Sequence, residues 1–293
     1  MRKAMVNSVK KMIEENVNAS LMLVDIGVWA FHELLEKYPQ RVKNIGIFED
    51  GTISIAAGLA LGGVIPTVYG ISPFIVQRAL EQLKLDFAYQ KLGGNFITTG
   101  ASYDFSTLGY SHYCPEDVAT LKTIPGIEVL CPGSPSEFTS LFNQCWNDGC
   151  PTYYRMTDFP NKTTVNVEFG KANVIKTGTK ATVITAGEML DTVLEACKDF
   201  DVTVIYYSTL EPFDYETLRN NFVGEKVFVS TPFYNGTLTN DIMKALGEKK
   251  FLFKEKSVPR KILRNYGTKT DKDLLLGLTK EELSKSLKEF INK

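Results

Sequence analysis

The stretch KNIGIFEDGTISIAAGLALGG, residues 43–63, decides how the first half of the chain is interpreted. Residues 45–48 are apolar and predict a buried strand, and residues 53–61 are almost wholly apolar and predict a buried helix. Between the two segments stand Glu49 and Asp50. The chain therefore places two carboxylates where both flanking segments are expected to enter a core. Acidic residues are rarely buried without a partner, so this position suggests a chemical role.

The composition is that of a soluble globular protein without a strongly charged partner. The 293 residues allow two ordinary domains, and 33 Lys and Arg residues balance 34 Asp and Glu residues. This balance indicates neither nucleic acid nor a membrane as a partner. The longest apolar run, residues 53–68, is interrupted by glycines and is too short to span a bilayer. Five scattered cysteines without a CxxC pair are typical of reduced thiols, so we expect a cytoplasmic protein.

Apolar runs rich in β-branched and aromatic residues alternate with helical patterns along most of the chain. Because these runs do not alternate with polar residues, they predict strands covered on both faces, which is typical of an α/β fold with parallel sheets. The candidate strands are residues 21–26, 44–48, 64–69, 95–99, 127–132 and 151–156 in the first half, and 180–187, 202–208 and 226–231 in the second.

Helix starts and a polar segment complete this organisation. Ser72 and Ser134 each precede a proline and predict helix N-caps, and Thr279 opens a capping box before the last helix. The polar segment that begins at residue 158 lacks helical periodicity and marks a boundary. We therefore expect domains at residues 1–160 and 172–293, joined by a linker at 161–171.

Ligands of such folds bind beyond the carboxyl ends of the strands, which is where Glu49, Phe74 and His112 are expected. Each also has an ordinary structural interpretation. Glu49 and Asp50 are suitable first-turn acids for the following helix, Phe74 suits a core, and His112 suits a hydrogen-bonded loop. No GxGxxG, P-loop or GxSxG motif is present, so a self-contained nucleotide site and a serine hydrolase are not indicated.

Residues 45–63 resemble the segment of transketolase-type thiamine-diphosphate enzymes in which a catalytic glutamate precedes an AAGLA helix. PTVYGISPFIVQRALEQ, residues 66–82, resembles the aromatic loop and helix of that family. Residues 109–137, which contain GYSHYCPED, are similar to its histidine signature, and PTYYRMTDFP, residues 151–160, resembles its arginine-bearing strand. The resemblance covers about the first 160 residues and continues more weakly beyond them. It implies a parallel-sheet pyrimidine-binding domain followed by a smaller α/β transketolase C-terminal domain.

The resemblance implies roles around the cofactor for three residues. Glu49 falls on the catalytic glutamate, Phe74 on the ring that packs against the pyrimidine, and Asp25 on a residue near the thiazolium. Thiamine diphosphate reacts through a C2 carbanion, which forms when the aminopyrimidine adopts its imino tautomer. A half-buried carboxyl stabilises that tautomer because it shares a proton with the ring nitrogen. On this interpretation Asp50 is an ordinary helix-start acid.

The resemblance also implies substrate contacts. His112 is expected to act as a catalytic and substrate-binding residue, and Arg155 and Arg2 are expected to bind anionic substrate groups. The alternative for Arg155 is a structural ion pair with Asp158 or another acid. No residue is expected to bind a metal in this chain.

Family enzymes hold the diphosphate through Mg²⁺ bound by a GDG motif and a later asparagine, and this sequence has no GDG. We therefore expect Mg²⁺ ligands from a partner, the N-terminal subunit of a split transketolase, and self-association in an α2β2 heterotetramer. The chain is then the C-terminal subunit, and it transfers a two-carbon ketol unit from a ketose donor to an aldehyde acceptor only with that partner.

Three positions depart from the family pattern: Gly100 and Trp29 replace a histidine and a serine, and Leu108 replaces an acid. These losses indicate an acceptor other than a common pentose phosphate. Two other functions remain open. One is the β subunit of a 2-oxo acid dehydrogenase decarboxylating component, whose histidine usually lies in HSQ rather than GYSHYC. The other is a non-catalytic binding or scaffold homologue, which would not need Glu49 and His112 together.

Overall fold

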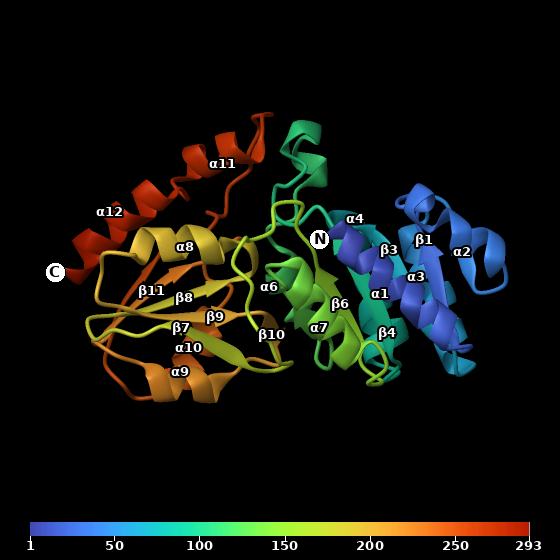
Figure 1. Cartoon of the computed structure of the whole chain (residues 1–293), viewed down its shortest axis with the longest axis horizontal. Coiled ribbons are helices and arrows are strands. Elements are labelled where there is room, and N and C mark those ends of the chain that lie inside the picture. Colours follow the sequence, from blue (N-terminus) through green and yellow to red (C-terminus); the bar gives the residue numbers. More distant parts are fainter. Residues whose placement is uncertain (293) are drawn as a thin grey trace.

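The computed structural model describes residues 1–292 and contains two α/β bodies that lie side by side, each built on a mostly parallel sheet (Figure 1). In this part of the chain, no helix combines the length and the apolar character needed to cross a membrane. The α/β fold with parallel sheets that the apolar runs predict is confirmed.

The first sheet has seven strands in the order β10-β5-β6-β4-β3-β1-β2. Six of them are parallel, and β10 pairs antiparallel with β5. The strands are β1 (Ala19–Leu23), β2 (Val42–Asn44), β3 (Ile65–Ile71), β4 (Gly94–Thr99), β5 (Glu128–Leu130), β6 (Pro151–Arg155) and β10 (Thr209–Glu211). Because β10 comes from the second half of the sequence, it joins the two bodies through backbone hydrogen bonds.

Helices cover both faces of this sheet because neighbouring residues of each strand point to opposite sides. Leu21 and Tyr69 pack with α1 and α7, whereas Met22 and Val68 pack with α3 and α6. The helices of this body are α1 (Arg2–Glu15), α2 (His32–Lys37), α3 (Glu49–Leu61), α4 (Ser72–Val76), α5 (Leu80–Gln82), α6 (Asp117–Leu121) and α7 (Pro135–Cys145), with short turns η1 (Val28–Phe31), η2 (Leu83–Ala88), η3 (Ser106–Leu108) and η4 (Tyr110–His112).

The second sheet has five strands in the order β12-β11-β8-β9-β7, of which only β7 is antiparallel to its neighbour. The strands are β7 (Ala172–Lys176), β8 (Thr182–Ala186), β9 (Thr203–Tyr207), β11 (Lys226–Ser230) and β12 (Leu252–Glu255). Helices α8 and α12 lie over one face, and α9 and α10 lie under the other (Figure 1). The helices are η5 (Gly187–Met189), α8 (Leu190–Cys197), α9 (Tyr215–Asn221), α10 (Thr239–Leu246), α11 (Lys269–Leu276) and α12 (Lys280–Ile291).

The predicted buried strand at residues 45–48 is wrong. Strand β2 ends at Asn44, whose side-chain oxygen accepts a hydrogen bond from the backbone N–H of Gly46. Gly46 has a φ of +87°, a left-handed conformation that ends the strand. Ile47 and Phe48 are 72% and 53% exposed, so this segment is an apolar loop at the surface.

Two of the three predicted caps are confirmed. The backbone N–H of Glu137 donates to Ser134 Oγ, and that of Glu282 donates to Thr279 Oγ1, each over 3.4 Å. The Ser72 hydroxyl instead bonds to Thr98 Oγ1 and to the carbonyl of Thr99, each at 3.0 Å. It therefore joins the ends of β3 and β4, next to the site described below.

Candidate active site

Glu49 is the first residue of α3 and follows the carboxyl end of β2. Its side chain is only 3% exposed, and its Oε2 accepts a hydrogen bond of 2.5 Å from Arg78 Nη1. Asp50 is half-buried and follows in the first turn of the helix. The two acids are therefore unequal, because only Glu49 is sequestered from water and paired with a cation.

Phe74, in α4 after the carboxyl end of β3, is linked to this carboxylate through Arg78. The Arg78 guanidinium carbon lies over the Phe74 ring, 4.4 Å from its centroid, in a cation–π arrangement. The His112 ring packs edge to face on Phe74 with a centroid separation of 5.2 Å. We call Glu49, Phe74, Arg78 and His112 the Glu49 group. It brings together three residues predicted from the sequence.

Arg78 is the member of this group that was not predicted. The sequence does contain a signal, because Arg78 stands four residues after Phe74 in a helical pattern, a spacing that places two side chains on one face. Without the position of Glu49 in space, this spacing does not distinguish a site residue from an exposed arginine.

His112 is carried by a loop that projects from the first body and contacts the second. The Tyr113 hydroxyl lies within hydrogen-bonding distance of two carbonyls, 3.2 Å from that of Asn265 and 3.1 Å from that of Ser106. In Figure 1 the green loop therefore lies beside the red segment that precedes α11. Ser111 Oγ lies 3.1 Å from His112 Nδ1, which leaves the other ring nitrogen available for a ligand.

Asp25 lies at the end of β1, next to the end of β2, and is exposed. Its φ of +58° is unusual for a residue other than glycine. Asn44 supports this conformation, since its Nδ2 donates to Asp25 Oδ1 over 3.2 Å and its Oδ1 accepts from the Asp25 backbone N–H over 3.0 Å. Asp25 thus shares the carboxyl edge of the sheet with Glu49, and its contact with a cofactor stays a prediction.

Arg2, at the start of α1, forms an ion pair of 3.4 Å with Asp158. The two side chains are 50% and 33% exposed, so the pair is accessible to solvent. Asp158 follows β6 and also accepts a hydrogen bond from Thr99 Oγ1. Arg2 therefore lies at the carboxyl edge of the sheet and is already partly neutralised.

Arg155 does not fit the predicted role in substrate binding, because its side chain is fully buried. Its Nε donates to Asp117 Oδ2 over 2.9 Å, and its Nη1 donates to Glu188 Oε2 over 2.9 Å. Glu188 belongs to η5 of the second body, and its side chain is 2% exposed. The structural alternative, an ion pair with an acid, describes this residue, although the partners are Asp117 and Glu188 rather than Asp158.

A further acid, Asp104, lies against this ion-pair network. Burial, together with the charge of Glu188, raises the pKa of Asp104 to about 8. Its Oδ2 accepts from the backbone N–H of Asp158 over 2.8 Å. The raised pKa favours the protonated form of Asp104, which reduces its competition with Asp117 and Glu188 for Arg155.

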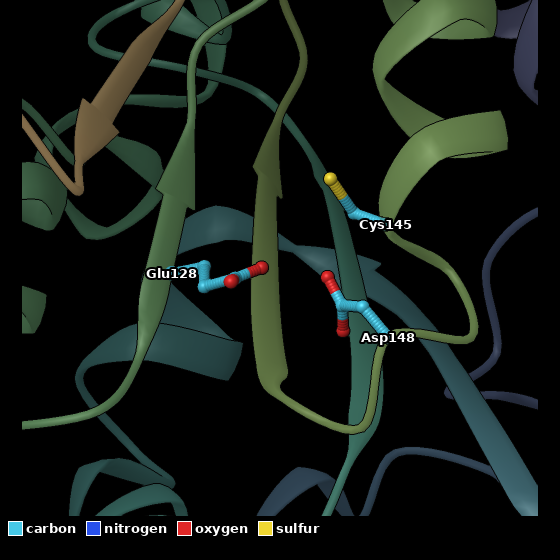
Figure 2. Close-up of side chains that lie close together, drawn as sticks. All are labelled: Glu128, Cys145 and Asp148. Atoms are coloured by element: carbon cyan, nitrogen blue, oxygen red, sulfur yellow. The ribbon is translucent and has the colours of Figure 1, made fainter. Parts of the chain in front are cut away.

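A second group of ionisable side chains lies at the opposite, amino-terminal edge of the first sheet. The potential ligand atoms of Glu128, Cys145 and Asp148 lie within 4.8 Å of one another, and Figure 2 shows the Glu128 and Asp148 carboxyl groups pointing toward each other. These are donor types found in zinc sites. Burial and the adjacent Asp148 raise the pKa of Glu128 to about 7, so a proton shared between the two carboxyl groups accounts for their proximity.

This shared proton predicts a pH-dependent stability. Because the pKa of Glu128 is raised to about 7 from 4.5, its contribution is full below pH 4.5 and is lost as the pH rises through about 7. Glu128→Gln removes this loss. When the pH is raised from 5 to 8, we expect the unfolding free energy of the variant to rise by about 1–2 kcal/mol relative to that of the original chain, after allowance for solvent screening.

Urea unfolding at both pH values measures this difference, with the exposed Glu195→Gln as the matched control. Equal behaviour of Glu128→Gln and the control at both pH values would exclude the shared proton.

Residues 1–157 match the family described as "Transketolase, pyrimidine binding domain". The chain belongs to the transketolase family. Residues 170–279 also match "Transketolase, C-terminal domain". Membership of this family associates the chain with thiamine-diphosphate-dependent enzymes and confirms the resemblance found in the sequence.

Several relatives of this transketolase-family chain match at least two thirds of its length. The chain is 33% identical to an uncharacterized 33.6 kDa protein in the fasciation locus of Rhodococcoides fascians, over 95% of this chain and 91% of that protein. It is 29% identical to one of the subunits of the apulose-4-phosphate transketolase of Actinobacillus succinogenes, over 69% and 68% respectively. A solved structure described as a split gene transketolase, an inactive beta4 tetramer, has the same fold, with a TM-score of 0.85 at 22% identity over 99% of this chain and 97% of that one.

Proposed function

We propose that this chain is the C-terminal subunit of a two-component transketolase, in which residues 1–160 form the pyrimidine-binding domain and residues 172–293 the C-terminal domain. The enzyme transfers a two-carbon ketol unit from a ketose to an aldehyde acceptor. The observation that carries the proposal is the Glu49 group, in which a buried carboxylate, an aromatic ring and a histidine meet at the carboxyl edge of a parallel sheet. The Actinobacillus relative is named as one subunit of a transketolase, and this supports a two-component enzyme.

The residues present fit the aminopyrimidine of thiamine diphosphate. Glu49 is a buried carboxyl beside a ring face, and a planar group with N–H donors, the Arg78 guanidinium, already occupies that environment. Glu49 would share a proton with the pyrimidine nitrogen, Phe74 would pack against the ring, and Asp25 would lie on the thiazolium side. When bound, the cofactor supplies a nucleophilic carbon for ketol transfer.

Substrate contacts are assigned to His112 and Arg2. His112 lies beside Phe74 on a loop, so it can hold and exchange a proton with a substrate hydroxyl. Arg2 would hold an anionic substrate group if Asp158 releases it. Arg155 is left out of this proposal because both of its charged partners are buried with it.

The diphosphate and its Mg²⁺ are assigned to a partner protein. The elements around Glu49 carry a surface that suits contact with another chain. Its exposed apolar residues are Phe48, Ile55 and Leu85, which lie on or next to α3 and η2. A hydrogen bond of 2.7 Å from Ser54 to Asp86 joins these two elements. Apolar surface of this kind marks protein interfaces. We assign it to self-association within an α2β2 heterotetramer, which sedimentation of the assembled complex measures.

The substrate is proposed to be an unusual ketose or aldehyde rather than a common pentose phosphate. Trp29 and Leu108 are 93% and 53% exposed, and Gly100 has a φ of +81° with the Phe105 ring beside it. Trp29 and Leu108 offer exposed apolar surface in place of the expected serine and acid, and the buried Gly100 offers no side chain in place of the expected histidine. The relative named for apulose 4-phosphate also indicates a less common sugar.

The proposal is tested by reconstitution. The chain is assembled with a candidate partner that carries GDG and a downstream asparagine, and ketol transfer is measured with a panel of ketoses and aldehydes. We expect transfer only in the presence of both subunits. Efficient use of ribose 5-phosphate or erythrose 4-phosphate as acceptor would overturn the substrate assignment, and absence of ketol transfer from any complex that forms would overturn the function.

A further inference from the structure

We propose that Arg78 is a place-holder that occupies the contacts of the cofactor pyrimidine until the cofactor binds. This inference rests on the proposed function, and it concerns how that site is kept in the unloaded chain. Arg78 makes two contacts: its Nη1 donates to Glu49 Oε2 over 2.5 Å, and its guanidinium lies 4.4 Å from the Phe74 centroid.

The chemistry of a guanidinium explains why it suits this place. It is planar, it carries N–H donors for a carboxylate, and it stacks on aromatic faces. An aminopyrimidine is also planar, and it is proposed to use the same carboxylate and the same ring. Glu49 Oε2 and one face of Phe74 cannot serve both groups at once, so binding of one requires departure of the other.

Burial explains why a place-holder is useful. The Glu49 side chain is 3% exposed, and a buried carboxylate without a partner is strongly destabilising. The Arg78 side chain is 45% exposed, so it reaches Glu49 from the surface and keeps contact with water. Arg78 lies in the turn between α4 and α5, so it can stabilise the unloaded site and still leave it without unfolding either helix.

The structure also offers Arg78 a place to go. A groove beside it is lined by Asp50 and Glu81, and both acids lie on the same solvent-facing side as Arg78. Arg78 lies in the turn between α4 and α5, and the exposed Glu81 follows in α5 on the wall of the same groove. If the Arg78 side chain moves from Glu49 to these acids, it exchanges one carboxylate partner for another. The free-energy cost of displacing it is therefore modest.

The first experiment measures thiamine diphosphate binding by calorimetry of the assembled two-subunit complex with Mg²⁺. Arg78→Gln removes the competing cation, so we expect its Kd to be about three- to tenfold lower than that of the original complex. Lys84→Gln removes a neighbouring exposed charge and is the matched control, with an unchanged Kd. An equal or higher Kd for Arg78→Gln would overturn the place-holder, whereas failure of the original complex to bind the cofactor would overturn the proposed function instead.

The second experiment needs no cofactor and uses thermal unfolding of the full chain. Arg78→Gln leaves Glu49 buried and unpaired, so we expect the Tm to fall by about 2–4 °C. In a Glu49→Gln background the same change should have almost no effect, because no charge is then left unpaired. Equal losses in both backgrounds would show that Arg78 acts elsewhere and would overturn the pairing.

Discussion

Glu49→Gln is expected to lower the turnover of the reconstituted complex by about 10²–10⁴-fold, the scale of a general acid–base contribution. Glutamine keeps the size and hydrogen-bonding capacity of the side chain, but its amide cannot exchange a proton with the pyrimidine nitrogen. Cofactor binding should weaken much less, because the diphosphate contacts are assigned to the partner. Turnover and exchange of the cofactor C2 proton, both measured with the assembled complex, report this loss.

Asp50→Asn is the matched control, because it alters the adjacent acid on the same first turn of α3. A helix-start acid contributes about 0.3–1 kcal/mol through its interaction with the helix dipole, so turnover should change little. If Asp50→Asn abolishes C2 proton exchange while Glu49→Gln leaves it intact, the catalytic carboxyl has been assigned to the wrong residue.

Arg155→Leu is expected to cost about 3–5 kcal/mol of unfolding free energy, because it leaves Asp117 and Glu188 buried without their shared cation. The network joins the two bodies, so the loss should appear as a lower denaturant midpoint for the whole chain. Adding Asp117→Asn and Glu188→Gln to Arg155→Leu removes the unpaired charges and should restore part of the lost stability.

Arg2→Leu provides the comparison for this prediction, since its ion pair with Asp158 is exposed to solvent. Exposed pairs contribute about 0–1 kcal/mol, so the denaturant midpoint should barely move. Urea unfolding of both variants is the measurement. A midpoint for Arg155→Leu as high as that for Arg2→Leu would contradict a structural role for the buried network.

Local sequence patterns predict most of the fold, because apolar runs and helix caps depend on neighbouring residues. The strand before Glu49 was misplaced for a reason of the same local kind. Residues 45–48 are apolar enough for a strand, but the side chain of Asn44 and the left-handed Gly46 end β2 first. The side chains of Ile47 and Phe48 then face the surface, whereas the apolar pattern of the sequence predicts that they are buried.

Motifs in the sequence are sufficient to predict that Glu49, Phe74 and His112 lie together, whereas no local pattern indicates the long-range contacts of Arg78 and Arg155. Glu49, Phe74 and His112 come from separate motifs, and parallel strands bring them to one edge of the sheet. Arg155 also ends a strand of that sheet, but η5 of the second body covers it with Glu188. No sequence pattern near Arg155 indicates that a residue of the second body buries it.

The measurement that tests the central claim most directly is calorimetric titration of thiamine diphosphate with Mg²⁺ into three samples: this chain, the partner, and their equimolar mixture. The proposed two-component site predicts tight, Mg²⁺-dependent binding only in the mixture. When the Glu49→Gln variant replaces the original chain in that mixture, binding should release less heat. Submicromolar, Mg²⁺-dependent binding to this chain without the partner would contradict the division of the cofactor site between two subunits.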